Sequence, residues 1–294
     1  MQLNGIILKG IGGFYYVETA EGVFECKAKG RFRRERLTPL AGDRVLISIN
    51  DNAENTIDEI AERKNYLLRP PVANIDNLLL VVSMCEPSPN TLVIDKMTTM
   101  AERKGIKPII VFSKTDLASA EALIDIYKST GYRIFSVSPN DKSDLEKIRE
   151  LLSGKLTAFT GNSGAGKSTL INALCPSLEL TTAQVSSKLG RGRHTTRQAE
   201  IFHINDGLII DTAGFSSLDL TSDDPILKDE LALYFPEFQE YIGQCKFTSC
   251  AHIGEKGCKI CEMVNAGLIS RSRHDNYIQL YNDAKNIKKW ELSH

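Results

Sequence analysis

Residues 161–168 read Gly-Asn-Ser-Gly-Ala-Gly-Lys-Ser and match the whole G-x-x-x-x-G-K-[ST] pattern of a phosphate-binding loop. The glycines of such a loop let backbone N–H groups surround phosphate oxygens, while Lys167 reaches the terminal phosphates and the Ser168 hydroxyl meets Mg²⁺. A short β-type run at 156–160 precedes the loop, and a helical pattern over 168–174 follows it, so the positive end of a helix faces the phosphates. The loop therefore predicts an α/β nucleotide-binding domain.

A second nucleotide motif stands about forty-five residues before the loop instead of after it. The apolar run 107–112 ends in Ser113-Lys114-Thr115-Asp116, which resembles the [N/T]-K-x-D motif with which GTPases recognise guanine. The Asp116 carboxylate accepts hydrogen bonds from the ring N–H and the exocyclic amine of guanine, a pattern that adenine does not supply. Ser113 replaces the usual Asn, which leaves open whether a contact to the base or to the phosphate loop is lost. The reversed order of the motifs predicts a circularly permuted domain.

The chain around these motifs alternates between strand and helix patterns. Near-continuous apolar runs at 77–84 and 107–112 are typical of parallel strands that are covered on both faces. Helical patterns separate or follow such runs at 92–103, 118–129 and 142–152, and further strands are predicted at 133–137 and 207–210. Ser136 lies near the end of one of these strands, where GTPases make a weaker backbone contact to guanine.

Two segments that follow the phosphate loop are typical of nucleotide-dependent switches. The first is Gly-Arg-Gly-Arg-His-Thr-Thr at 190–196, a glycine-rich and basic stretch in which Thr195 or Thr196 can close on Mg²⁺ and the γ-phosphate. The second is Asp211-Thr-Ala-Gly214. We expect Asp211 to hold the metal shell and the Gly214 amide to contact the γ-phosphate.

The residue that organises hydrolysis differs from the usual one. Phe215 stands where many GTPases have a Gln that orients water. We expect His194 to orient or activate the attacking water, with Arg191, Arg193 or Arg197 available to stabilise the developing charge. The alternative is that His194 contacts RNA or solvent and that a partner completes the site, as in arginine-finger systems.

These segments together predict the whole nucleotide site. The residues expected to contact GTP are Ser113, Lys114, Thr115, Asp116, Ser136, Gly161, Asn162, Ser163, Gly164, Ala165, Gly166, Lys167, Ser168, Thr169, Asp211 and Gly214. We expect Mg²⁺ to be bound with GTP by Ser168, Thr196 and Asp211.

The first 65 residues or so have a different pattern, with five short alternating runs at 4–9, 13–19, 22–28, 43–49 and 55–60. Five strands in so short a segment favour an oligonucleotide-binding (OB) barrel. The connection between the third and fourth strands carries Lys27, Lys29, Arg31, Arg33, Arg34 and Arg36. Because the net charge is −1, RNA has to be bound by such a local patch, which can follow a phosphate backbone. The alternative is a solvated charged loop on a structural barrel.

A second constellation lies near the C-terminus, with the spacing Cys245-x₄-Cys250-x-His252-x₅-Cys258. Three thiolates and one imidazole form a closed tetrahedral zinc site, which stabilises a fold and leaves no position for substrate. Cys261 offers an alternative in which four cysteines bind the ion and His252 does not.

The helical pattern over 262–289 that follows carries several basic side chains, namely Arg271, Arg273, His274, Lys285, Lys288 and Lys289. These suit either a second RNA-facing surface or an ordinary solvated helix face. Leu68-Arg-Pro-Pro71 is the predicted linker after the barrel, because two prolines resist both helix and interior strand. The predicted domains are a barrel over 1–67, a nucleotide domain over 68–218 and a mainly helical zinc-binding domain over 219–294.

Composition limits the class of protein. The 294 residues are 42% hydrophobic and 25% charged, as in soluble globular proteins of two or three domains. There is no signal-peptide pattern and no apolar run that approaches roughly 18 residues, so we expect no membrane segment and a cytoplasmic protein. Seven cysteines without a secretory signal favour thiols and metal ligands over disulfides.

The order of these motifs resembles the ribosome small subunit-dependent GTPase A (RsgA) family of circularly permuted GTPases over essentially the whole chain. The resemblance implies binding to the small (30S) ribosomal subunit and its rRNA, GTP hydrolysis stimulated by that subunit, and a role in its late maturation. It also implies a catalytic His at the position of His194, and one structural Zn²⁺ held by Cys245, Cys250, His252 and Cys258. Nothing in the sequence requires more than a monomer.

Overall fold

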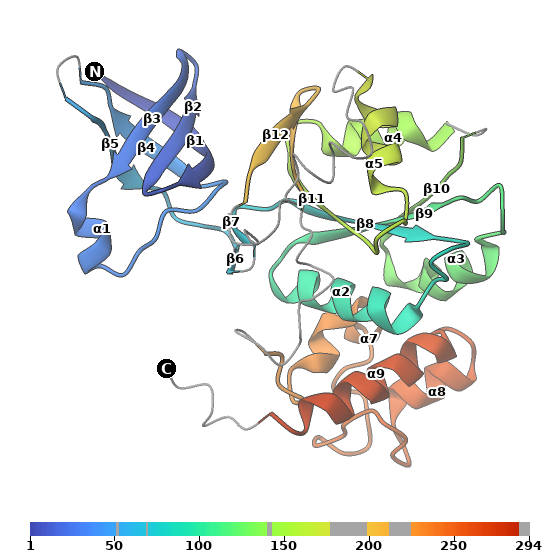
Figure 1. The fold of residues 1–294 in the computed structure, drawn as a ribbon. Helices are drawn as coiled ribbons and strands as arrows, with labels where there is room; N and C mark the ends of the chain where they lie inside the picture. Colours follow the sequence, from blue (N-terminus) through green and yellow to red (C-terminus); the bar gives the residue numbers. More distant parts are fainter. Residues whose placement is uncertain (51–52, 69, 140–142, 177–198, 212–224, 288–294) are drawn as a thin grey trace. The chain divides into compact units, whose positions relative to one another are not determined.

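The computed structural model describes residues 1–287 except 51–52, 69, 140–142, 177–198 and 212–224 (Figure 1). The chain divides into two compact units. The first holds residues 1–79, 145–160 and 167–216, and the second holds 80–144, 161–166 and 217–294. No helix in the described ranges is long and apolar enough to cross a membrane.

The N-terminal strands form a closed barrel, which confirms the OB-like expectation. The strands are β1 (Gln2–Ile11), β2 (Phe14–Thr19), β3 (Gly22–Ala28), β4 (Arg44–Ser48) and β5 (Asn55–Ile60). Their order around the barrel is β1-β2-β3-β5-β4; β3 and β5 are parallel, and β1 closes the barrel by antiparallel pairing with β4. Apolar side chains of all five strands fill the interior, and Ile7, Ile47 and Ile57 are fully buried there. The alternating pattern of the sequence arises from this inward and outward alternation.

Most of the basic run lies in the connection between β3 and β4, as expected, and part of it folds as the short helix α1 (Gly30–Arg34) at one end of the barrel (Figure 1). Phe32 is 3% exposed and packs with the barrel core, which fixes the helix. Asp58 supports the same helix, since its carboxylate lies 2.9 Å from Lys29 Nζ and its backbone carbonyl accepts a hydrogen bond from Arg31. Although burial acts to raise the pKa of Asp58, hydrogen bonds from Ser48, Lys29, Thr56 and Gln2 lower it far below the usual range.

The predicted linker is also partly regular structure. Strands β6 (Tyr66–Leu68) and β7 (Pro71–Ala73) pair antiparallel as a two-stranded ribbon. Pro71 is tolerated because it is the first residue of its strand, and both strands of a two-stranded ribbon are edges. This agrees with the expectation that the prolines resist helix and interior strand, because β7 is an edge strand.

The nucleotide domain contains a six-stranded sheet with the order β10-β9-β8-β11-β13-β12. These strands are β8 (Asn77–Ser83), β9 (Lys107–Ser113), β10 (Arg133–Val137), β11 (Leu156–Thr160), β12 (Ile201–Ile204) and β13 (Gly207–Asp211). The pairs β9–β10 and β11–β13 are parallel, whereas β12 pairs antiparallel with β13. Every residue of β8 and of β11 is buried, which explains their near-continuous apolar sequences. Strand β12 is too short to have been recognised from its sequence.

Among the described residues, the strands are accompanied by α2 (Thr91–Arg103), α3 (Glu121–Tyr127), α4 (Ser143–Leu152) and α5 (Lys167–Leu174). Helix α2 begins after Asn90, whose side-chain Oδ1 accepts a hydrogen bond from the Val93 N–H at 3.2 Å. Helix α3 is shorter than the predicted 118–129, because residues Lys128–Thr130 tighten into a 3₁₀ turn that Gly131 ends at φ 74°.

The C-terminal segment is mainly helical, as expected, with a 3₁₀ turn (Leu231–Tyr234), α7 (Pro236–Gln239), α8 (Lys259–Asn265) and α9 (Arg271–Ala284). Its core contains three aromatic rings, Phe235, Phe238 and Tyr277, whose centroids lie 5.0 to 5.2 Å apart. Arg273 and His274 of α9 are buried, so they belong neither to an RNA-facing surface nor to a solvated face. Lys288 and Lys289 lie outside the described residues.

A buried ion network joins α9 to α7 and α2. The Arg273 guanidinium lies 2.7 Å from Asp95 of α2 and 2.6 Å from Glu237 of α7, and the side chains of Arg273 and Asp95 have no exposed surface. The hydroxyl of Tyr127 and the amide of Asn276 donate to the Asp95 carboxylate at 2.8 and 2.6 Å. Burial acts against the charge of Arg273, but the two carboxylates outweigh it and raise its pKa. The network therefore fixes the C-terminal helices to α2.

Replacing Arg273 by Met should destabilise the protein strongly, because it leaves two buried carboxylates without their cation. Removal of one partner of a buried ion pair typically lowers the free energy of unfolding by about 3–5 kcal/mol. Urea unfolding followed by circular dichroism measures this loss. The matched control is Arg271→Met on the same helix, since Arg271 is exposed and should contribute less than about 1 kcal/mol. Equal midpoints for both variants would contradict the account.

Candidate nucleotide site and metal centre

The phosphate loop leaves β11 at Thr160 and enters α5 at Lys167. Gly161 has φ 143°, and a Cβ atom at this position would lie 2.3 Å from the carbonyl oxygen of Val81. Only glycine fits this approach between the loop and β8. Gly166 has φ 90° at the other end of the loop, which again favours glycine. The sequence pattern of the loop thus follows from the path of its backbone.

Helix α5 presents its N-terminal turn, with Lys167 and Ser168, at the end of this loop, and both side chains are half-buried. At the opposite end of the helix, Arg149 of α4 donates to the carbonyls of Ala173 and Leu174 at 2.7 and 3.0 Å. A cation at a helix C-terminus stabilises the helix and complements its dipole. The positive N-terminal end remains directed to the loop, as phosphate binding requires.

The base motif begins at the last residue of β9. The Ser113 hydroxyl donates a hydrogen bond of 2.6 Å to the carbonyl of Ala165 in the phosphate loop, and both residues are buried. The sequence left open whether Ser113 loses a contact to the phosphate loop. The structure shows that this shorter side chain keeps such a contact. The structure joins two motifs that stand far apart in the sequence.

Neighbouring backbone holds the rest of the motif in place. Lys114 has a left-handed conformation with φ 58°, and its ammonium group donates to the carbonyl of Glu86. The Thr115 hydroxyl donates to the carbonyl of Val137 at 3.3 Å.

Asp116 is exposed, and its carboxylate forms no hydrogen bond with any other described residue. Its two oxygens are therefore available to an external donor.

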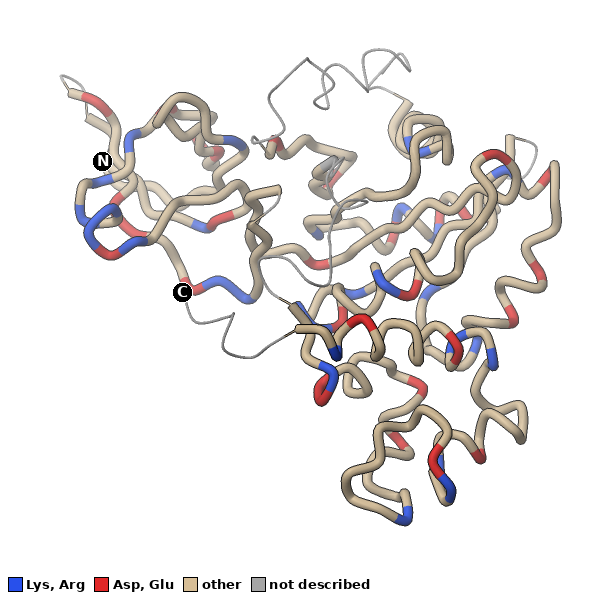
Figure 2. Tube along the Cα trace, turned by 60° about the horizontal axis from the view of Figure 1, so that its bottom comes forward, with Lys and Arg blue, Asp and Glu red and all other residues tan. Residues whose placement is uncertain are grey.

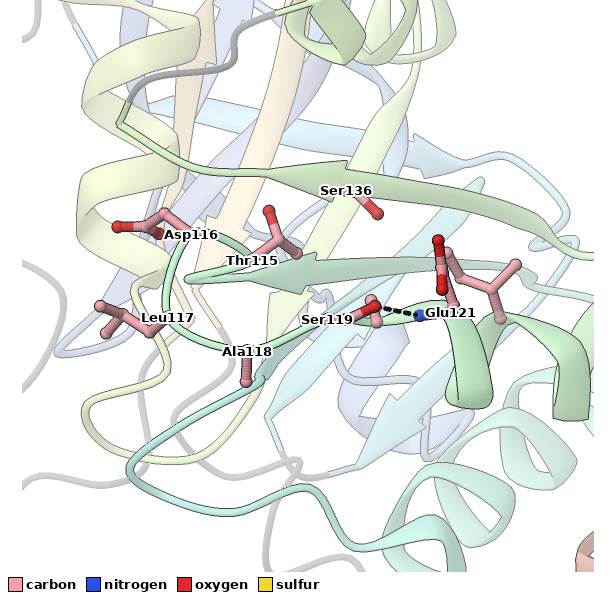
Figure 3. Close-up of a pocket in the computed structure, with 9 residues that line it drawn as sticks. Thr115, Asp116, Leu117, Ala118, Ser119, Glu121 and Ser136 are labelled. Carbon is pink, nitrogen blue, oxygen red and sulfur yellow. Dashed lines mark hydrogen bonds between the residues drawn. The ribbon is translucent and has the colours of Figure 1, made fainter.

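A hollow of about 430 Å³ lies beside this motif and is lined by residues 115–121 with Ile124 and Ser136 (Figure 3). The Ser136 N–H donates to the Asp144 carboxylate at 3.1 Å. Figure 3 shows the carboxyl group of Asp116 at one end of the hollow, away from Ser119 and Glu121 at the other. The structure thus brings Thr115, Asp116 and Ser136 together, as the sequence predicted.

The switch residues are only partly described. Thr195, Thr196, His194 and Gly214 lie outside the described residues. Asp211 is the last residue of β13, where the strand register sets it beside Phe159 of β11, just before the phosphate loop. The metal-binding role that the sequence suggested for Asp211 stays a prediction.

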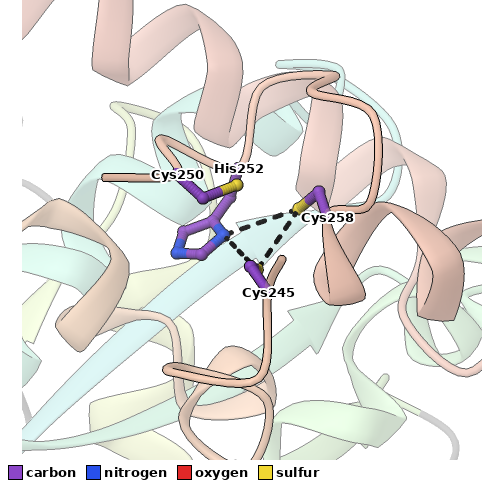
Figure 4. Close-up of side chains that lie close together, drawn as sticks. All are labelled: Cys245, Cys250, His252 and Cys258. Atoms are coloured by element: carbon purple, nitrogen blue, oxygen red, sulfur yellow. Dashed lines mark hydrogen bonds between the residues drawn. The ribbon is translucent and has the colours of Figure 1, made fainter. Parts of the chain in front are cut away.

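A second cluster lies in the C-terminal segment (Figure 4). The ligand atoms of Cys245, Cys250, His252 and Cys258 all lie within 4.8 Å of one another. The Nδ1 atom of His252 is 3.5 Å from the sulfurs of both Cys245 and Cys258, and these two sulfurs are 3.9 Å apart. Cys261 is not part of this group; its sulfur lies 3.8 Å from His274 Nε2. The geometry favours the set that includes His252 over the four-cysteine alternative.

Backbone donors shape the loop that carries this cluster. The Glu255 carboxylate accepts hydrogen bonds from the N–H groups of Ala251 and Ile253 at 2.7 and 2.9 Å. The Lys259 N–H donates to the Cys245 sulfur at 3.3 Å. Burial raises the pKa of both the Cys250 and the Cys258 thiols to about 12, so a metal ion has to displace their protons on binding.

The basic run divides into two groups. Figure 2 marks the Lys and Arg positions along the whole chain in blue and the acidic positions in red. The first group is paired: Lys27 lies 2.5 Å from Glu54, and Lys29 and Arg31 contact Asp58. The second group contains Arg33, Arg34 and Arg36, which are exposed and make no ion pair with any described residue. The sequence did not separate these groups, because their partners Glu54 and Asp58 come from a distant strand and the loop before it.

Two family models match the chain. The one described as RsgA GTPase matches residues 60–221, and the one described as RsgA N-terminal domain matches residues 4–57. A small ribosomal subunit biogenesis GTPase RsgA from Geobacillus sp. (strain WCH70) is 43% identical over 97% of this chain and 98% of its own length. The protein of the same name from Clostridium novyi (strain NT) is also 43% identical, over 94% and 96%.

Solved structures agree with these matches. The crystal structure of YjeQ from Thermotoga maritima has a TM-score of 0.85 and 32% identity, and the match covers 98% of this chain and 100% of that one. YloQ, described as a circularly permuted GTPase, has a TM-score of 0.80 and 32% identity over 97% and 96%. The permutation inferred from motif order is thereby confirmed. The chain belongs to the RsgA family of circularly permuted GTPases.

Proposed function

We propose that this GTPase binds the small ribosomal subunit and couples GTP hydrolysis to late maturation of that subunit. The bound subunit in turn stimulates GTP turnover. The observation that carries the proposal is the contact between Ser113 and Ala165, because it joins the guanine motif to the phosphate loop in one site. The names of the curated relatives, small ribosomal subunit biogenesis GTPases, support the choice of partner.

Recognition of guanine is assigned to Asp116. Its exposed carboxylate can accept from both guanine donors, whereas adenine would leave these oxygens without donors. The resulting difference in binding free energy between GTP and ATP amounts to a few kcal/mol. Each difference of about 1.4 kcal/mol corresponds to a tenfold difference in affinity. Lys114, fixed by the carbonyl of Glu86, keeps the motif in the orientation that presents Asp116.

The phosphates of GTP are assigned to the loop 161–168 and the first turn of α5. The backbone N–H groups and Lys167 supply positive charge there, which is the chemistry that an anionic ligand requires. Ser168, Thr196 and Asp211 would hold Mg²⁺, which neutralises charge on the β- and γ-phosphates when it is bound. His194 would orient the attacking water and accept its proton.

The ribosome-facing part is connected to the switches through β12. Lys9 of β1 forms a β-bridge with Glu200 and an ion pair of 2.7 Å with its carboxylate. His203 of β12 lies 2.7 Å from Glu18 of β2. Strand β12 follows the first predicted switch and pairs with β13, which leads to the second predicted switch. The nucleotide state can therefore influence the barrel through β12. This coupling requires that the ribosome binds the GTP and GDP states with different affinity.

The Cys and His cluster would hold one structural Zn²⁺. Thiolate and imidazole donors select zinc over hard cations such as Mg²⁺. The cluster lies between the loop and α8, so a bound ion stabilises the segment that Arg273 attaches to α2. A cytoplasmic location and a monomeric state agree with this function and stay predictions.

Replacing His194 by Ala should reduce subunit-stimulated GTP turnover by a factor of about 10² or more, the usual contribution of a general base. Nucleotide affinity should remain nearly unchanged, because His194 is expected to act on water and not on GTP. Phosphate release with and without small subunits, and titration with a fluorescent GTP analogue, measure the two quantities. Unaltered turnover would remove His194 from the mechanism, and a loss on Arg193→Ala alone would transfer the role to arginine.

Metal content should separate ligands from neighbours in the C-terminal cluster. We expect about one zinc per chain by elemental analysis, and loss of this zinc with a lower unfolding temperature in His252→Ala. The control is Cys261→Ser, which changes a neighbouring thiol outside the cluster and should keep its zinc. Zinc retained in His252→Ala and lost in Cys261→Ser would instead support the four-cysteine set.

A further inference from the structure

Helix α9 lies beside both α2 and α8 (Figure 1). Two of its side chains, Arg273 and Asn276, contact Asp95 of α2. The residue after each of these, His274 and Tyr277, is buried and contacts the loop that carries the metal cluster. Residues three apart share one face of a helix, and successive residues are turned by about 100°. Helix α9 therefore has a network face toward α2 and a loop face toward the cluster.

The loop face holds two successive carbonyl groups next to the cluster. His274 Nε2 donates a hydrogen bond of 2.7 Å to the carbonyl of His252. The Tyr277 hydroxyl donates one of 2.8 Å to the carbonyl of Ala251. The His274 and Tyr277 rings are stacked on each other with centroids 6.3 Å apart, so each ring limits the movement of the other. The Cys261 sulfur also lies near the His252 carbonyl, but at 3.9 Å and as a weaker donor.

His252 needs this support because of its backbone conformation. Its φ is 61°, in the left-handed region that residues other than glycine rarely adopt. Such a conformation persists only where the surrounding structure fixes it. In this conformation Nδ1 of His252 lies 3.5 Å from the sulfurs of both Cys245 and Cys258 (Figure 4). A relaxed backbone would therefore turn the imidazole away from the other ligands.

Two sets of contacts fix the backbone around His252, and they differ in origin. The Glu255 carboxylate accepts from the N–H groups of Ala251 and Ile253, so this support comes from within the loop itself. The bonds from α9 come from a helix that is fixed elsewhere in the fold, through Arg273. Only the second kind of contact can orient the loop relative to its surroundings.

We propose that His274 and Tyr277 are positioning residues for the metal ligand His252, which they hold through the backbone carbonyls of 251 and 252. The inference rests on the proposed zinc site. His274 offers no ligand atom of its own, because it lies outside the group of four residues whose ligand atoms are within 4.8 Å of one another. Residues that orient metal ligands typically contribute a factor of about 10–100 to metal affinity.

Two amide variants of His274 distinguish positioning from packing. In His274→Gln, the side-chain N–H₂ group reaches the place of Nε2 and can still donate to the His252 carbonyl. In His274→Asn, the amide ends nearer the backbone, at the place of Nδ1, and does not reach this carbonyl. Both variants lose the ring that stacks on Tyr277, so packing alone predicts similar effects. Positioning predicts that His274→Gln restores what His274→Asn loses.

The test uses the full-length protein with Zn²⁺ and with Co²⁺ in its place. Competition with a chromophoric chelator measures zinc affinity, and visible absorption of bound Co²⁺ reports the ligands and their geometry. We expect His274→Asn to lower zinc affinity by about tenfold or more. It should also shift the ligand-field bands of Co²⁺ while thiolate charge-transfer absorption remains, because the imidazole is displaced and the cysteines are not. His274→Gln should match the unsubstituted protein in both measurements.

The matched control is Asn276→Ala on the network face of the same helix. It removes a hydrogen bond of 2.6 Å to Asp95 but no contact with the metal loop. This variant should therefore keep the zinc affinity and the Co²⁺ spectrum of the unsubstituted protein, even where its unfolding temperature falls.

The inference is overturned by an unchanged zinc affinity and Co²⁺ spectrum in His274→Asn, or by equal losses in His274→Asn, His274→Gln and Asn276→Ala. If His274→Asn does not fold, as judged by circular dichroism, Tyr277→Phe decides, because it keeps the ring and removes only the hydroxyl that holds Ala251. Unchanged metal binding in Tyr277→Phe would then overturn the inference. An unsubstituted protein that binds neither metal rejects the proposed zinc site itself, whereas metal binding that is insensitive to these variants rejects the positioning role alone.

Discussion

The hydrogen bond from Ser113 to the carbonyl of Ala165 is the contact on which the nucleotide site depends. It connects the end of β9, which carries the guanine motif, to the loop that surrounds the phosphates. The close approach of Gly161 to Val81 fixes the same loop against β8. Circular permutation changes the order in which the chain visits these parts but keeps their contacts. The guanine motif and the phosphate loop therefore belong to one site.

Permutation has a further consequence for the parts outside the nucleotide domain. Strand β13 ends at Asp211, and the chain then continues to the C-terminal helices instead of the guanine motif. The Arg273 network attaches these helices to α2, which leads into β9. The barrel is linked to β12 by Lys9 and Glu200. Both ends of the β12–β13 hairpin thus lead to predicted switches, and the barrel is connected to it.

The sequence predicted most of this arrangement where periodicity or fixed spacing carries the information. The barrel strands, β11 and the metal cluster follow from alternation, apolar runs and ligand spacing. It did not predict α1, because only the buried Phe32 distinguishes that helix from a charged loop. Arg273 resembled a solvated side chain, since its partners Asp95 and Glu237 come from distant segments. Features that depend on such long-range pairing have no local signal.

The most direct test of the central claim compares GTP and ATP hydrolysis by the purified protein with Mg²⁺, alone, with small ribosomal subunits and with large ones. The account predicts that small subunits selectively stimulate GTP turnover, because Asp116 excludes adenine and the barrel recognises RNA of that subunit. Equal rates for both nucleotides, or equal rates with either subunit, would contradict the account.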